Sequence, residues 1–156
     1  MNNKRRSFIK SSAAAGAFGV AVGAGLIAPR AVLAAWPKAA FEAKEVNAAV
    51  QGAFGSSAMA DSSDITLKAP EIAENGAVVP ITVTSKIPNT ESISLLISEN
   101  PTPLTATFHL GSNTEGFVST RVKMSKTSDV VAVVKSGDKL FSTKLTVKVT
   151  IGGCGG

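Results

Sequence analysis

Residues 140–151 impose the strongest constraint on the fold, because side chains there alternate between two kinds of face without interruption. Successive side chains of a β-strand point to opposite faces, so this period of two predicts a long strand with one buried and one mostly solvated face. The predicted buried face carries Phe141, Thr143, Leu145, Val147, Val149 and Ile151. The opposite face carries Leu140, Ser142, Lys144, Thr146, Lys148 and Thr150. Such a strand needs a second layer to cover its apolar face.

Shorter β-rich segments precede this strand, at residues 65–68, 78–83, 92–98, 104–110, 117–124 and 130–135. Ser136, Gly137 and Asp138 follow the last of them and predict a hairpin turn. Turn-rich links join the segments, and strands do not alternate with helices. This pattern predicts a mainly β fold of seven strands, an immunoglobulin-like antiparallel β-sandwich.

Local features add detail to the predicted strands. Pro80 predicts an edge strand or a bulge, because proline cannot donate to a strand ladder. The apolar run at residues 95–97 exceeds strict alternation and favours a strand buried on both faces, with a partner protein as one candidate for the second cover. Alternation in the next segment places Leu104 and Phe108 on one face and His109 on the other, where we expect a solvated or hydrogen-bonded side chain and not a ligand.

One helix is predicted before the strands. Residues 38–54 carry Phe41, Val50 and Phe54 near helical spacing, and Gly55 follows as a stop signal. We expect this N-terminal helix to pack its apolar face on the domain. A face that binds a partner is the alternative.

Composition excludes several classes of function. The 156 residues contain one Cys and one His, which rules out an intramolecular disulfide and argues against a Cys/His zinc site within the chain. A Ser-His-Asp enzyme would have to use His109 as its base. We therefore expect no metal, no cofactor and no catalytic residue.

The net charge of +5 belongs to the N-terminal segment. Its positive residues are Lys4, Arg5, Arg6, Lys10 and Arg30, and no acidic residue occurs before position 35. The chain has 16 Lys and Arg, so 11 remain after these five and balance the 11 Asp and Glu. Nucleic-acid binding needs positive charge on the folded surface, and this balance argues against it.

The same segment has the layout of a secretory signal. Arg5 and Arg6 precede an apolar run at 13–28, and Val32, Leu33 and Ala34 form a small-residue cleavage site. The paired arginines are typical of the twin-arginine route. The alternative, a membrane anchor, is disfavoured because a span needs about 20 apolar residues. We expect a cleaved signal peptide at 1–34, export to the periplasm, a domain at 35–151 and no membrane association after cleavage.

The chain ends in Gly152, Gly153, Cys154, Gly155 and Gly156. Glycine offers no side chain to hold a fixed contact, so residues 152–156 are predicted to form a flexible arm. A thiolate carried there is a handle that attacks oxidised sulfur and forms an S–S adduct. An arm without side chains would let that adduct enter narrow active sites. The pattern predicts a carrier that acts with separate enzymes and is not itself an enzyme.

Other uses of Cys154 remain open on the residues alone. It could form an intermolecular disulfide, as an odd Cys does in an oxidising compartment. It could serve a thiol-disulfide redox module whose second Cys comes from a partner, or belong to a structural β-sandwich with an incidental tail.

The twin-arginine signal, helix, sandwich and ending V-K-V-T-I-G-G-C-G-G together resemble the SoxY family, the sulfur-carrier subunits of the periplasmic thiosulfate-oxidising (Sox) system. The resemblance implies an immunoglobulin-like fold and a heterodimer with a second sandwich subunit, SoxZ. It implies that Cys154 carries thiosulfate-derived sulfur on the arm of Gly152, Gly153, Gly155 and Gly156. It also implies partner enzymes: a c-type cytochrome that attaches sulfur, a manganese hydrolase that releases sulfate, and a sulfane dehydrogenase.

Overall fold

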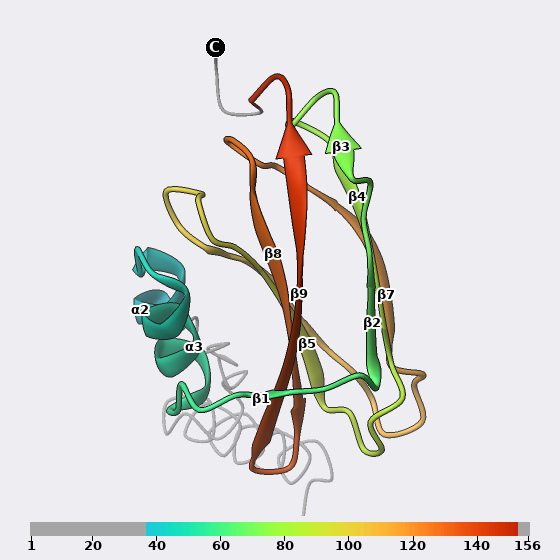
Figure 1. The fold of residues 1–156 in the computed structure, drawn as a ribbon. Coiled ribbons are helices and arrows are strands. Elements are labelled where there is room, and N and C mark those ends of the chain that lie inside the picture. Colours follow the sequence, from blue (N-terminus) through green and yellow to red (C-terminus); the bar gives the residue numbers. More distant parts are fainter. Residues whose placement is uncertain (1–36, 153–156) are drawn as a thin grey trace, which may run out of the picture. The chain divides into compact units, whose positions relative to one another are not determined.

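The computed structural model describes residues 37–152 (Figure 1). The described helices and strands all belong to one compact unit of the chain. The predicted signal peptide, with Arg5 and Arg6, lies outside the described residues. Within the described part, no helix is both long enough and apolar enough to cross a membrane.

The described residues form a β-sandwich with helices on one side (Figure 1). Its strands are β1 (Ala60–Asp61), β2 (Ile65–Lys68), β3 (Ile72–Ala73), β4 (Val79–Ser85), β5 (Ser92–Ile97), β6 (Leu104–His109), β7 (Phe117–Val122), β8 (Ser128–Ser136) and β9 (Lys139–Val149). The larger sheet has the order β1-β9-β8-β5-β6, with β3 also paired to β9, and the smaller sheet has the order β2-β4-β7. The prediction of a mainly β, immunoglobulin-like sandwich with an N-terminal helical segment is confirmed.

All seven predicted strands are present, and the structure adds β1 and β3, which pair in parallel with β9. A strand of two residues has no periodicity to detect, so the sequence could not reveal these two. The predicted hairpin is confirmed. Ser136 pairs with Lys139 across the turn, and Gly137 has a φ of +57° at the first turn position.

Apolar side chains from both sheets fill the space between them. The large side chains that are fully buried there include Ile81, Val83, Ile93, Leu95, Ile97, Met124, Val130, Val134 and Val147. The predicted inward face of β9 is correct for Val147, which is fully buried, and for Phe141 and Val149, which pack against the cluster. It is wrong for Ile151, which lies beyond the last residue of β9 and is exposed.

Two helices cover the outer face of the larger sheet (Figure 1). They are α2 (Lys38–Glu42) and α3 (Val46–Phe54), and they pack over Leu96, Val133 and Leu140. Every residue of β5 is buried, as its unbroken apolar run predicted. The second face of β5 is covered by the chain's own helices.

The prediction of one helix over 38–54 is wrong, because the chain leaves the helical conformation at Ala43 and folds back. The two helices then approach so closely that a Cβ on Gly52 would lie 2.8 Å from the backbone nitrogen of Ala40. This hairpin buries small residues from both helices, Ala40 and Ala49, on the same sheet face. Helical spacing alone cannot reveal such a break. The end at Gly55 is confirmed.

The predicted shared face of Leu104 and Phe108 is also wrong. A register shift in β6 places Ala106 opposite Leu95 but Leu104 opposite Leu96, which leaves Thr105 between them as a bulge. Leu104 therefore turns to the helices, whereas Phe108 packs on the inner core. His109 is exposed at the end of β6, as predicted.

Pro80 lies in β4, the central strand of the smaller sheet, opposite Arg121 of β7. The other neighbour, β2, pairs only with residues 82–85. Pro80 therefore occupies a stretch of β4 with one neighbouring strand, which is the environment that proline tolerates. The expected edge is local and does not extend along the whole strand.

Candidate functional site

The predicted site lies at the C-terminal end of β9. Cys154, with Gly153, Gly155 and Gly156, falls outside the described residues, and Gly152 is the last described residue. The structure therefore defines the base from which the predicted arm leaves the sandwich. We call residues 150–152 the arm root.

One side of the arm root is held by the segment that contains β3. The Thr150 N–H donates to the Ala73 carbonyl at 3.1 Å, and the Thr150 hydroxyl donates to the Glu74 carbonyl at 2.9 Å. The Gly76 N–H then donates to the Ile151 carbonyl at 2.7 Å. These bonds continue the β3–β9 pairing past the last residue of β9, so the chain keeps its course up to Ile151.

The loop between β7 and β8 holds the other side. The Val149 N–H donates to the Thr127 hydroxyl at 2.9 Å. Gly152 lies against the backbone carbonyl of Ser125, so closely that a Cβ on Gly152 would be 2.3 Å from that oxygen. The arm root thus lies between two backbone segments, and only a glycine fits at position 152 in this conformation.

Asn100 fixes the loop that carries Ser125. Its side-chain oxygen accepts from the Ser125 N–H at 3.0 Å, and its amide nitrogen donates to the Lys123 carbonyl at 2.8 Å. The Ser125 hydroxyl donates to the Glu99 carbonyl at 3.0 Å. The Met124 N–H donates to the Gly76 carbonyl at 2.7 Å, which ties this loop to the segment on the opposite side of the arm root. No sequence motif marks these residues, because they act mainly through backbone groups or, for Asn100, through a single side-chain amide.

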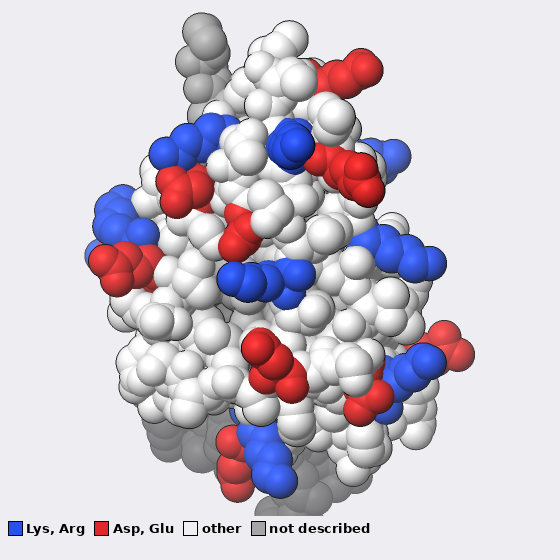
Figure 2. All heavy atoms as spheres, in the orientation of Figure 1, with Lys and Arg blue, Asp and Glu red and all other residues white. Residues whose placement is uncertain are grey.

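The surface charges do not favour either sign. On the face drawn in Figure 2, Lys and Arg are interspersed with Asp and Glu, in agreement with the balance predicted beyond the N-terminal segment. Near the arm root, Lys126 pairs with Glu99 at 2.7 Å. At the other end of the sandwich, a hydrogen bond from Lys135 and its positive charge hold the pKa of the Glu91 carboxyl below its usual value.

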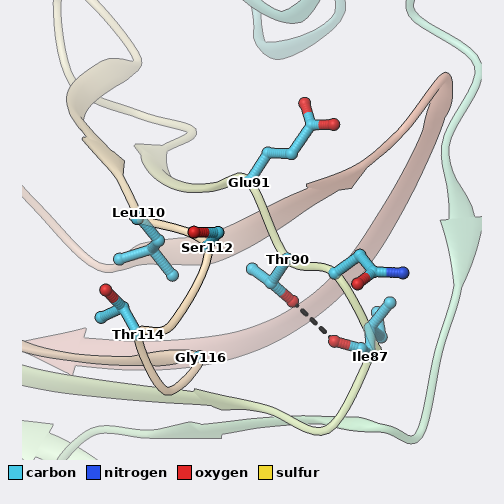
Figure 3. Close-up of a pocket in the computed structure, with 9 residues that line it drawn as sticks. Ile87, Thr90, Glu91, Leu110, Ser112, Thr114 and Gly116 are labelled. Carbon is cyan, nitrogen blue, oxygen red and sulfur yellow. Dashed lines mark hydrogen bonds between the residues drawn. The ribbon is translucent and has the colours of Figure 1, made fainter.

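Elsewhere, the described residues contain few groups that could react or bind a ligand. A hollow lies at the end of β5 opposite to the arm root (Figure 3). It is lined by Ile87, Asn89, Thr90, Glu91, Leu110, Gly111, Ser112, Thr114 and Gly116. The Thr90 hydroxyl in it already donates to the Ile87 carbonyl at 2.8 Å, and Glu91 is its one ionisable residue. Residues 37–152 contain no cluster of His, Cys, Asp and Glu that could hold a metal.

His109 is also remote from the arm root. It pairs with Ser92 at the start of β5, whereas the arm root lies near the opposite end of the larger sheet, where Ser128 pairs with Val147. Strands rise about 3.3 Å per residue, so the length of β5 separates this imidazole from the base of the arm.

Comparison with known proteins finds a family match and a related solved structure. Residues 50–154 match the family described as "Sulfur oxidation protein SoxY". The solved structure of the sulfur carrier protein SoxY from Chlorobium limicola f thiosulfatophilum is 41% identical, with a TM-score of 0.63, and the match covers 74% of this chain and 100% of that one. A PKD domain of an M14-like peptidase from a Thermoplasmatales archaeon is 18% identical over 55% of this chain and 91% of its own, with a TM-score of 0.37. No curated protein matches the chain.

Proposed function

The chain belongs to the SoxY family of sulfur oxidation proteins, and on this basis we propose that it is a covalent sulfur carrier whose attachment site is Cys154. The observation that carries the proposal is the family match, which runs through the arm root and includes the only Cys of the chain. The related protein of known structure is itself described as a sulfur carrier.

The chemistry of the thiol defines the carrier step. Oxidative coupling of the Cys154 thiol to thiosulfate forms one S–S bond, releases the thiol proton and removes two electrons, which a c-type cytochrome partner accepts. Hydrolysis of the terminal sulfonate then releases sulfate and leaves a persulfide on Cys154. A manganese hydrolase would perform this second step, and a sulfane dehydrogenase would oxidise the remaining sulfur.

We propose that partner enzymes supply all catalysis. A general base must come within hydrogen-bond reach of the proton that it removes. His109 is the only imidazole, and it lies at the opposite end of the larger sheet from the arm root. The equal numbers of opposite charges beyond residue 34 suit a protein that visits several enzymes in turn.

The cellular setting is part of the same proposal. Residues 1–34 act as a cleaved twin-arginine signal, with Arg5 and Arg6 as its motif, and the protein works in the periplasm. A SoxZ-like β-sandwich subunit forms the heterodimer. A disulfide between two Cys154 thiols would link heterodimers into a higher oligomer.

Intact-mass measurement tests this function. The protein is isolated from cells growing on thiosulfate, and sulfur adducts that a reductant removes are expected on the wild-type chain. The Cys154→Ser variant should carry no adduct and should not support thiosulfate-dependent oxygen uptake, although its fold is kept. A wild-type chain that stays unmodified while the pathway runs would overturn the proposal. A chain found only as a Cys154–Cys154 dimer would instead favour the redox or structural alternative.

A further inference from the structure

We propose that Gly152 is a positioning residue that holds the base of the carrier arm, so that the freely moving tether of Cys154 begins only at residue 153. This inference rests on the proposed function of Cys154. The sequence assigns Gly152 to the arm together with the other glycines, but its surroundings differ from those of a loose tail.

The contact with Ser125 carries the inference. A Cβ at position 152 would lie 2.3 Å from the Ser125 carbonyl oxygen and 3.4 Å from its carbonyl carbon. Real Cβ atoms essentially never approach another atom within 3.0 Å, and here the neighbour is backbone, which cannot rotate away as a side chain does. Glycine at this position therefore allows two backbone segments to pack together.

The surroundings of the contact make it a fixed point. Asn100 holds the Ser125 loop through two hydrogen bonds, of 3.0 and 2.8 Å. Gly76 bridges both neighbours of the contact, because its N–H donates to Ile151 and its carbonyl accepts from Met124, each at 2.7 Å. A displacement of Gly152 would therefore disturb the arm root, the Ser125 loop and the segment around Gly76 at once.

A fixed base limits where the thiol can go. Two extended residues span about 7 Å, so the Cα of Cys154 stays within about that distance of Gly152. An enzyme that acts on Cys154 must then bring its reaction centre close to this end of the sandwich. The partner enzymes would recognise the surface around the arm root as well as the arm.

Hydrogen exchange at Gly76 tests the anchoring in the full-length protein. Gly152→Ala should accelerate exchange of the Gly76 amide about tenfold, because loss of one hydrogen bond changes a local opening equilibrium by roughly that factor. Gly153→Ala adds the same methyl group one residue further on and should leave this amide unchanged. Equal exchange in Gly152→Ala and wild type, or equal acceleration by Gly153→Ala, would overturn the inference.

A distance measurement tests the effect on the tether. Spin labels are placed on Cys154 and on Lys139→Cys, an exposed position at the start of β9. Gly152→Ala should displace or broaden the distribution of distances between them, and so should Asn100→Ala, which loosens the loop without changing the arm. Distributions that match the parent in both variants would contradict the inference. Neither readout depends on sulfur loading, so a Cys154 that never carries sulfur would refute the proposed function alone.

Discussion

Leu104 lies opposite Leu96 in the larger sheet, and both side chains are buried beneath the helices. The pair exists because the bulge at Thr105 turns Leu104 away from the inner core. Apolar contacts of this kind join the helical layer to the sandwich, so the helices and the larger sheet should unfold together.

Leu96→Ala should lower the free energy of unfolding by about 2–5 kcal/mol, because Leu96 is fully buried and its truncation leaves a cavity in the cluster beneath the helices. Urea unfolding followed by circular dichroism measures the change. Val78→Ala is the matched control, since Val78 is 54% exposed and its truncation should cost no more than about 0.5 kcal/mol. Equal losses in the two variants would contradict the burial of Leu96.

Gly52→Ala should destabilise the protein, although alanine is the better helix former by about 1 kcal/mol. The added Cβ would lie 2.8 Å from the Ala40 nitrogen and 2.9 Å from the Ala40 Cα, so α2 would have to move away from α3. The exposed α3 residue Asn47 provides the control, because Asn47→Ala gains helix propensity without meeting α2. Opposite shifts of the urea midpoint are expected, and an increase in both variants would contradict the close approach.

These positions show how far the sequence can predict the fold. Alternation over residues 140–151 predicts β9 because each side chain of a strand reports its own face. The helix break, the Thr105 bulge and the contact at Gly152 each depend on a partner far away in the sequence: the sheet beneath α2, the register with β5 and the Ser125 carbonyl. A local sequence pattern contains no information about partners so distant along the chain. Cys154 lies outside the described residues, and its role stays a prediction that the sequence can make because the chemistry depends on its own thiol.

Glu91 should titrate below its usual pKa of 4.5, since Lys135 donates a hydrogen bond to its carboxylate and attracts it. A carboxyl with a lowered pKa contributes stability above its unfolded value, and this contribution is lost as the pH falls below 4.5 through the folded value. Lys135→Met should raise the pKa of Glu91 towards 4.5, as measured by NMR titration of its side chain. Lys123→Met removes a similar charge near the arm root and should not change this titration. A pKa that Lys135→Met leaves unchanged would contradict the pairing.

The surface around the arm root should take part in recognition by partner enzymes. Ile151 is 68% exposed and lies directly before Gly152, so a partner enzyme that reaches a thiol on a tether of about 7 Å should touch it. Ile151→Lys should slow the loading of Cys154 from thiosulfate, measured by intact mass after mixing the reduced carrier with an extract of thiosulfate-oxidising cells. Reaction of the same thiol with a small aromatic disulfide should be unchanged, because that reagent needs no contact with the sandwich.

Phe117→Lys is the matched control for that variant. Phe117 is 51% exposed at the start of β7, where it pairs with Thr84, and this is the end of the smaller sheet remote from Val122 and the loop that holds the arm root. The Phe117→Lys variant replaces an apolar surface residue with the same cation, so its Cys154 should be loaded at the wild-type rate. Equal slowing in both variants would indicate a general effect of charge. Wild-type loading in Ile151→Lys would mean that partner enzymes recognise the arm alone and that the tether reaches further than a fixed Gly152 allows.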